Sequence, residues 1–103
     1  MVLRSGIVEE SKVNAVIDIV LRQLAPDVKR IRYDIEQDWS GDDAIFYRIL
    51  ISDDAARMRL RETVRNAVSM LESHLNLETM GLRVYHNVRT ESEQASLREK
   101  SWE

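Results

Sequence analysis

Residues 38–54 read DWSGDDAIFYRILISDD, and they decide the fold because they contain a turn, a strand and a helix start in succession. The first six of these residues include Gly41, which suits a turn position with positive φ. Residues 44–51 are apolar on nearly both faces, interrupted by a single arginine, which predicts a strand. Ser52 then predicts a helix N-cap followed by an acidic first turn. The rest of the chain must pack around this strand.

An amphipathic helix and a second strand are expected before the turn. Apolar residues recur at helical spacing from Val13 to Leu24, and Pro26 ends the pattern. From Lys29 to Glu36 the period changes to two, with Ile and Tyr on one face and Arg, Asp and Glu on the other. This strand and the next one, joined by the short turn, predict a β-hairpin.

A second helix, a third strand and a helical tail are expected after residue 52. The helix should cover residues 54–74, and its predicted buried stripe consists of Leu60, Val64, Ala67, Val68, Leu71 and Leu75. A strand over residues 82–89 follows Gly81, and Ser92 should cap a short final helix over residues 93–102. The apolar residues of this tail do not form one stripe, so it is either loosely docked or available to a partner.

The predicted fold is a single α+β domain over residues 1–103, with element order αββαβ. Residues 1–7 form an N-terminal tail and residues 90–103 a C-terminal helical tail. The crossover through the second helix makes the third strand parallel to the second. We expect it to lie beyond the first strand. Each main helix has one apolar stripe, so both should cover the same face of a three-stranded mixed sheet.

The composition limits the possible functions. The 103 residues are 44% hydrophobic and 32% charged, as in an ordinary globular protein. The absence of cysteine excludes thiolate catalysis, disulfides and Cys-ligated zinc. The apolar runs are too short for a signal peptide or a membrane span, so we expect a cytoplasmic protein. The net charge of −3 argues against a general polyanion binder, although twelve of the 15 basic residues are arginines.

One part of the turn resembles half of a calcium-binding loop. Asp38, Ser40 and Asp42 place oxygen ligands at alternate positions, as in an EF-hand. The EF-hand glycine and bidentate glutamate are replaced by Asp43 and Ile49, so the pattern fails where it is most specific. We therefore interpret the segment as a hairpin turn in which Asp and Ser accept hydrogen bonds from backbone amides.

Other catalytic patterns are also incomplete. His74 and His86 are the only histidines, and neither has a nucleophile motif nearby. No glycine-rich phosphate-binding loop is present. Asp34, Glu36 and Asp38 share one strand face, as a magnesium site could require, and equally as the solvated face of an edge strand. We predict no catalytic residue, no metal site and no cofactor, and keep a metal-dependent enzyme using these carboxylates as the second alternative.

Three residues are the leading candidates for binding a protein partner. Trp39 lies in the turn, where an aromatic residue either folds over the core edge, which is the arrangement favoured here, or is exposed as an anchor for a partner. Arg48 interrupts an otherwise apolar strand. Trp102 lies near the C-terminus, where exposure is expected in the monomer. A hairpin alone requires neither Trp39 nor Arg48, so we predict that these residues contact the partner.

A basic stripe provides the first alternative function. Arg57, Arg61 and Arg65 recur at i, i+4 and i+8 on the second helix. Together with Arg83 and Tyr85 of the third strand, they would form a surface for RNA or DNA. Neighbouring acidic residues dilute this surface, and such a stripe is also typical of a solvated helix face.

A longer pattern resembles one found in small bacterial proteins of unassigned function. It reads W-x-G-D-x-A-I-F-x-R-I over residues 39–49, and SEQASL follows at residues 92–97. The residues that carry the resemblance are Trp39, Gly41, Asp42, Ala44, Ile45, Phe46, Arg48, Ile49 and Asp53. The resemblance implies a bacterial, cytoplasmic, stand-alone domain and supplies no catalytic residue.

These observations favour a non-enzymatic protein-interaction or regulatory domain, such as one member of a two-gene bacterial system. Its expected partner is another protein or a second copy of the chain, with nucleic acid as the alternative and no membrane.

Overall fold

The computed structural model describes residues 10–77 and 81–103. In chain order the elements are α1 (Glu10–Leu24), β1 (Val28–Gln37), β2 (Asp43–Ile51), α2 (Asp53–Leu75), β3 (Arg83–Thr90), α3 (Glu91–Leu97) and the 3-10 helix η3 (Lys100–Trp102). They confirm the predicted α+β class, with a three-stranded mixed sheet and a short C-terminal helix. The predicted N-terminal tail, residues 1–7, lies outside the described residues.

The sheet has the order β1-β2-β3, so β2 is the central strand. It pairs antiparallel with β1 and parallel with β3, as predicted. The expectation that the third strand lies beyond the first is wrong, because β3 pairs directly with β2. The physical reason is burial on both faces of β2: Ile45 and Ile49 lie in the hydrophobic core, while Ala44 and Leu50 are buried on the opposite face. A strand that is apolar on both faces is suited to the centre of a sheet.

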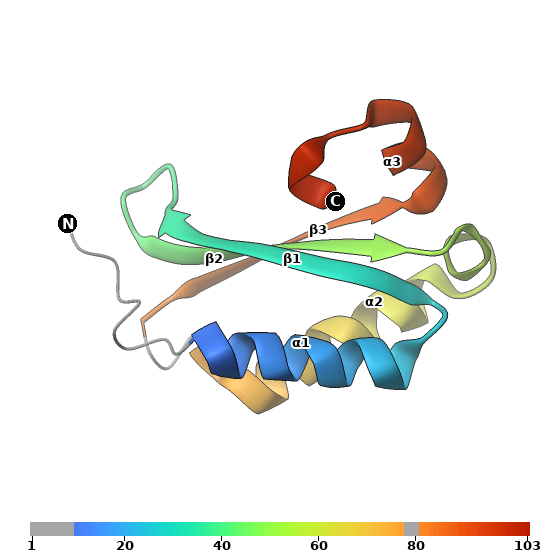
Figure 1. The fold of residues 1–103 in the computed structure, drawn as a ribbon. Coiled ribbons are helices and arrows are strands. Elements are labelled where there is room, and N and C mark those ends of the chain that lie inside the picture. The colour runs from blue at the N-terminus through green and yellow to red at the C-terminus, as the bar shows by residue number, and fades with distance from the viewer. Residues whose placement is uncertain (1–9, 78–80) are drawn as a thin grey trace.

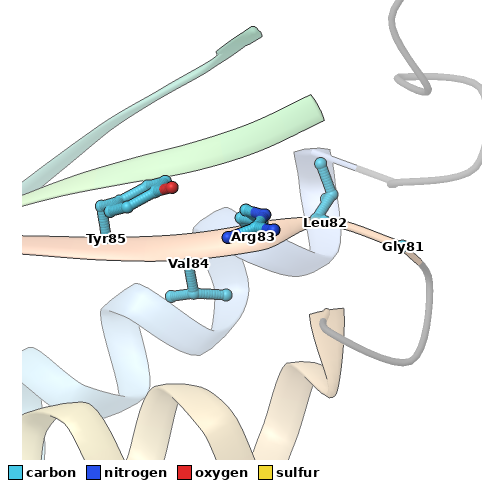
Figure 2. A pocket seen from close by; sticks show the side chains of 5 residues that line it. All are labelled: Gly81, Leu82, Arg83, Val84 and Tyr85. Atoms are coloured by element: carbon cyan, nitrogen blue, oxygen red, sulfur yellow. The ribbon is translucent and has the colours of Figure 1, made fainter. Parts of the chain in front are cut away.

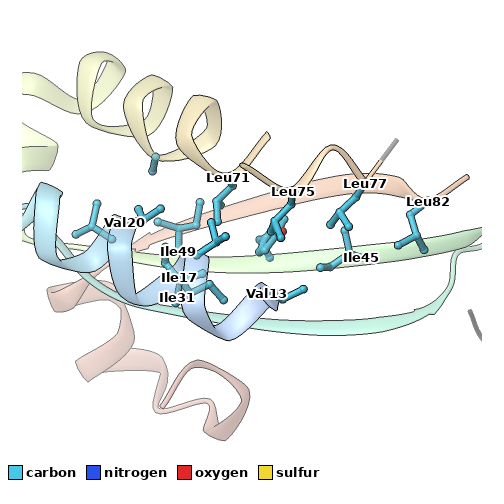
Figure 3. Packing of buried hydrophobic residues seen from close by; sticks show 14 of the residues in the cluster. Val13, Ile17, Val20, Ile31, Ile45, Ile49, Leu71, Leu75, Leu77 and Leu82 are labelled. Atoms are coloured by element: carbon cyan, nitrogen blue, oxygen red, sulfur yellow. The ribbon is translucent and has the colours of Figure 1, made fainter. Parts of the chain in front are cut away.

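The chain forms three layers. Helices α1 and α2 cover one face of the sheet, here called the inner face, as predicted (Figure 1). Helix α3 and η3 lie over the opposite, outer face (Figure 1). The core lies between the two main helices and the inner face (Figure 3). Its fully or almost fully buried residues include Val13, Val20, Ile31, Ile45, Tyr47, Ile49, Ile51, Ala67, Leu71 and Leu82.

Helix α2 begins as predicted but contains a kink that the periodicity did not predict. Ser52 is its N-cap and accepts a hydrogen bond from the Ala55 amide (3.0 Å). Arg59 has non-helical backbone angles, and its guanidinium donates two hydrogen bonds to the Asp27 carboxylate (2.6 and 2.7 Å). The kink shifts the helical phase. Leu60, expected in the core, is therefore 48% exposed, while Thr63 is buried in the first half of the helix.

The C-terminal tail begins at a different cap from the predicted one. Thr90 is the N-cap of α3 and forms a capping box with Glu93, so Ser92 lies inside the first turn. The Ser92 amide and hydroxyl instead donate to the Asp53 carboxylate. The expected single helix over residues 93–102 is also wrong, because Arg98 adopts a left-handed conformation (φ 55°) that separates α3 from η3. This turn folds the end of the chain back over the outer face.

Candidate functional site

The candidate site lies on the outer face and starts at the β1–β2 turn. Asp38 Oδ1 accepts hydrogen bonds from the amides of Ser40 (2.9 Å) and Asp42 (3.0 Å) and from the Ser40 hydroxyl (2.7 Å). Gly41 has the expected positive φ of 88°. The predicted hairpin turn with backbone amides bonded to an Asp side chain is confirmed, whereas the Ser40 hydroxyl donates to the Asp38 and Asp42 carboxylates instead of accepting from an amide. These bonds, led by the one from the Ser40 side chain, lower the pKa of Asp38 to about 2.

Three aromatic rings from the turn, β2 and β3 form one continuous surface, which we call the aromatic patch: Trp39, Phe46 and Tyr85. The Phe46 and Tyr85 rings stack with centroids 5.0 Å apart and planes inclined by 14°. Their stacking follows from the register, in which these two residues are partners across β2 and β3. The Trp39 ring lies 5.2 Å from the Tyr85 ring. The three elements thus position a contiguous aromatic surface.

Tyr85 connects the patch to the turn. Its hydroxyl donates to Asp38 Oδ2 (2.8 Å), and this bond to a carboxylate is the main reason that the pKa of Tyr85 is raised. The Tyr85 side chain points to the outer face, while Val84 points to the helices (Figure 2). Trp39 is nevertheless 82% exposed. The expectation that Trp39 folds over the core edge is therefore wrong, because the hydrogen-bonded turn presents the indole ring to solvent.

Charged pairs border the patch on two sides. Arg83 Nε lies 2.9 Å from Asp42 Oδ2, beside the turn. On β1, Asp34 is the register partner of Phe46 and accepts a hydrogen bond from Arg48 Nη1 (2.7 Å). Polar residues around an apolar centre are the usual arrangement of a protein–protein interface.

The other half of the outer face is covered by the tail, residues 91–103. Arginines from two strands bind the carbonyl groups at the end of the chain. Arg30 Nη1 donates to the Trp102 carbonyl (2.9 Å), Arg32 Nε to the Glu103 carbonyl (2.6 Å) and Arg48 Nε to the Ser101 carbonyl (2.6 Å). Carbonyls at a helix C-terminus lack intrahelical partners, so these charge-assisted bonds satisfy groups that would otherwise need water.

Trp102 is the apolar anchor of the tail. It is only 6% exposed, so the expectation of exposure in the monomer is wrong. The Arg89 guanidinium lies over its ring, 4.3 Å from the ring centroid. Arg89 also donates to Gln94 Oε1 (2.9 Å) and Glu99 Oε1 (2.9 Å), and Gln94 Nε2 donates to the Glu99 carbonyl (2.7 Å). The tail is therefore closely docked.

An open hollow of about 430 Å³ separates the tail from the aromatic patch. Its lining comes from all three strands and from the tail. The residues are Asp34, Glu36, Phe46, Arg48, Asn87, Val88, Arg89, Glu93, Leu97 and Trp102. Arg48 and Trp102 thus lie at the border of the patch, bound to the rest of the chain, and their predicted contact with a partner stays a prediction. A second open pocket, of about 480 Å³, lies at the start of β3 along residues 81–85 (Figure 2).

The predicted nucleic-acid residues do not form one surface. Arg57, Arg61 and Arg65 lie on α2, which packs against the inner face, whereas Arg83 and Tyr85 point to the outer face (Figures 1 and 2). The Arg57 side chain is also bound to Asp54 (2.6 Å). The sheet therefore separates the two halves of the predicted site.

The histidines and carboxylates are placed apart from one another. His74 is in the last turn of α2, where it was expected, and the His86 ring stacks on Tyr47 with centroids 5.6 Å apart. Asp34 is bound to Arg48, and Asp38 is bound within the turn. Within residues 10–77 and 81–103, no group of three His, Asp or Glu side chains is arranged to hold a metal ion. No helix in the same ranges is long and apolar enough to cross a membrane.

Comparisons of the chain with protein-family models, with curated proteins and with solved structures each return no match. No related protein therefore indicates a functional site, and the candidate site is inferred from its geometry alone. Sequence reasoning identified Trp39 and Arg48 and considered Asp38 only as a metal ligand, and it did not assign Phe46 or Arg89 to a site. Their outward direction follows from strand alternation, whereas the pairing of Phe46 with Tyr85 requires the register between β2 and β3.

Proposed function

We propose that this chain is a non-enzymatic, cytoplasmic interaction domain that binds a partner protein through the aromatic patch, in the manner of one member of a two-gene bacterial system. One observation carries the proposal: Trp39 is 82% exposed on a turn whose conformation is fixed by hydrogen bonds to Asp38. Exposing a large aromatic side chain forgoes the free energy of burying it, so this position contributes little to folding.

The patch has the physical properties of an interface centre. Trp and Tyr are enriched among the residues that dominate binding energies, because they bury a large area at low cost in conformational entropy. The Trp39 and Tyr85 rings are already in contact with each other, and Tyr85 is held by Asp38. A preorganised surface loses little entropy on binding, which increases the affinity.

The border supplies specificity. The Arg83–Asp42 and Arg48–Asp34 pairs present both signs of charge next to the rings. A partner with an apolar centre and complementary charged groups at its rim would match this surface, and like charges at the rim would exclude other proteins. The hollow beside the patch provides room for a side chain of the partner.

The proposal is tested by recovering partners of the tagged protein from its native host. Trp39→Ala removes the centre of the patch. Met58→Ala is a matched control, because Met58 is 71% exposed on the kinked part of α2 and lies outside the patch. We expect one protein to be recovered by the wild type and by Met58→Ala, and recovery to fall at least about tenfold with Trp39→Ala. Equal recovery by all three proteins, or no recovered partner, contradicts the proposal.

A second candidate function is binding of RNA or DNA by α2. The kink at Arg59 exposes Met58 and Leu60, and Arg61 and Arg65 are exposed beside them. Neither Arg61 nor Arg65 forms an ion pair with another described residue, so both guanidinium groups can approach phosphates. Fluorescence anisotropy with labelled single-stranded RNA at low salt tests this function. Salt-dependent binding that is lost in Arg61→Glu/Arg65→Glu supports it, and no binding at low salt eliminates it.

A further inference from the structure

Strand β1 lies at one side of the sheet order β1-β2-β3, and among the described residues no other strand pairs with its outer edge, here called the free edge. The pairing with β2 determines which backbone amide and carbonyl groups of β1 point to this edge. The Asp38 amide donates to the Asp42 carbonyl (2.9 Å), and these two residues continue the β1–β2 register. Hydrogen-bonded and non-bonded pairs alternate in an antiparallel ladder, so even-numbered residues of β1 bond to β2. The amide and carbonyl groups of Ile31, Tyr33 and Ile35 therefore point to the free edge.

The sequence of this strand is complementary to itself. Residues 30–36 read RIRYDIE, with apolar positions symmetric about Tyr33 and charges of opposite sign on its two sides. We propose that two copies of this chain pair β1 with β1, antiparallel about Tyr33, to form a dimer with one continuous sheet. The inference does not depend on the proposed function of the aromatic patch.

Within residues 30–36, the outward-facing side chains that lie opposite each other across this interface carry opposite charges. Arg30 of one copy lies opposite Glu36 of the second copy, and Arg32 opposite Asp34. These even-numbered positions form the closer, non-hydrogen-bonded pairs, where opposite charges attract most strongly. Glu36 is exposed, and it forms no ion pair with any of the described residues. The dimer thus supplies a counter-charge that the monomer does not.

The inner side of the interface is apolar. Ile31 of one copy lies opposite Ile35 of the second, and the two Tyr33 residues lie opposite each other. Tyr33 and Ile35 pack against the core but are only partly buried in the monomer. Pairing would remove more of their apolar surface from water while the free-edge amides and carbonyls bond to each other.

The other edge of the sheet, formed by β3, is not complementary to itself. Strand β3 reads RVYHNVR over residues 83–89, so antiparallel self-pairing about His86 would place Arg83 opposite Arg89 at both ends. Like charges at directly opposite positions destabilise a pair of strands. Charges on edge strands normally prevent such association, and here the arrangement prevents it at β3 and favours it at β1.

The two-fold axis of the dimer runs perpendicular to the sheet, so the outer faces of both copies lie on the same side. Each copy keeps its aromatic patch and its docked tail. The two patches would then be displayed on one surface, which would allow bivalent binding of a dimeric partner.

Sedimentation equilibrium of the purified full chain tests the proposal. The wild type is expected to dimerise reversibly. Glu36→Arg places Arg opposite Arg30 twice in each dimer and should raise the dissociation constant by about tenfold or more. Glu62→Arg makes the same change in charge at an exposed position of α2 and should leave the dissociation constant unchanged. Mixing Glu36→Arg with Arg30→Glu restores both charge pairs and should restore association.

Because Arg30 also binds the Trp102 carbonyl, a second readout avoids any substitution. Amide hydrogen exchange of Ile31, Tyr33 and Ile35 in the wild type should be slower at high than at low protein concentration. A wild type that stays monomeric up to about 1 mM overturns the proposal. So does a dimer that is insensitive to Glu36→Arg, a mixture that fails to associate, or edge amides whose exchange does not depend on concentration.

Discussion

Trp39 and Trp102 lie on the same side of the sheet, yet one is 82% exposed and the other 6%. Both are large aromatic residues flanked by polar ones in the sequence. They differ in their surroundings on the outer face. The Arg89 guanidinium lies over the Trp102 ring, whereas the Trp39 ring, at the tip of the hairpin, lies beside the Tyr85 ring at a tilt of 52°. The comparison separates a tryptophan that stabilises the fold from one that is available for binding.

Replacing Trp102 should have the largest effect on stability. Trp102→Ala leaves a cavity under the tail and removes the ring over which Arg89 lies, so we expect a loss of about 3 kcal/mol in the free energy of unfolding. Urea denaturation followed by circular dichroism measures it. Trp102→Phe, which keeps a ring, should cost clearly less. A loss below about 0.5 kcal/mol for Trp102→Ala would show that the tail is not docked in solution.

Arg89→Lys should have the next largest effect. Lysine keeps the positive charge but cannot stack on Trp102 and bond to Gln94 and Glu99 in the same geometry. We expect a loss of about 1 to 2 kcal/mol in the free energy of unfolding, from the same urea experiment. Arg65→Lys on exposed α2 is the control and should be neutral. If both lysine variants are equally stable, the contact between Arg89 and the tail contributes nothing.

Acid should weaken the turn that carries Trp39. The pKa of Asp38 is about 2 in the folded chain, below its ordinary value of 3.8, because donors surround the carboxylate. A lowered folded pKa gives stability that is fully present above about pH 4 and is lost as the pH falls toward 2. Asp38→Asn has no titrating carboxylate at this position. The difference in the free energy of unfolding between the wild type and Asp38→Asn should therefore narrow as the pH falls over that interval. Urea midpoints measured at several pH values test this, and a constant gap would contradict it.

Replacing Trp39 should have the smallest effect on stability. Trp39→Ala removes a ring that is mostly exposed, so the free energy of unfolding should change by less than about 0.5 kcal/mol. In Trp102→Phe, where Trp39 is the remaining tryptophan, acrylamide should quench its fluorescence strongly. In Trp39→Phe the remaining Trp102 should be protected. Similar quenching in both variants would contradict the difference in exposure.

Much of the fold could be predicted because local patterns decide it. Ser52 caps α2 as expected, Gly41 has positive φ, and the apolar pattern of β2 correctly indicated a buried strand. The same two-sided pattern could also have shown that β2 is central, since only a central strand has neighbours along both edges and layers on both faces. The motif Thr90-x-x-Glu93 likewise contained the capping box that identifies the true start of α3.

The remaining errors come from interactions between distant residues. Leu60 fits the helical period, but the kink at Arg59, where Asp27 binds the side chain, changes the phase. Trp102 is buried because it packs on the outer face with the Arg89 guanidinium over its ring. The aromatic patch depends on the register that brings Phe46 next to Tyr85. None of these contacts between distant residues produces a periodic pattern in the sequence, so they could not be predicted from local sequence patterns.

Site-specific photo-crosslinking directly tests whether a partner protein binds at Trp39. A photoreactive phenylalanine analogue is placed at position 39, and in a separate protein at position 58, and both are irradiated in the native host. We expect a discrete crosslinked product with a second protein from position 39, lost when Tyr85→Ala is added, and none from position 58. No product from position 39, or equal products from both positions, would contradict binding at Trp39.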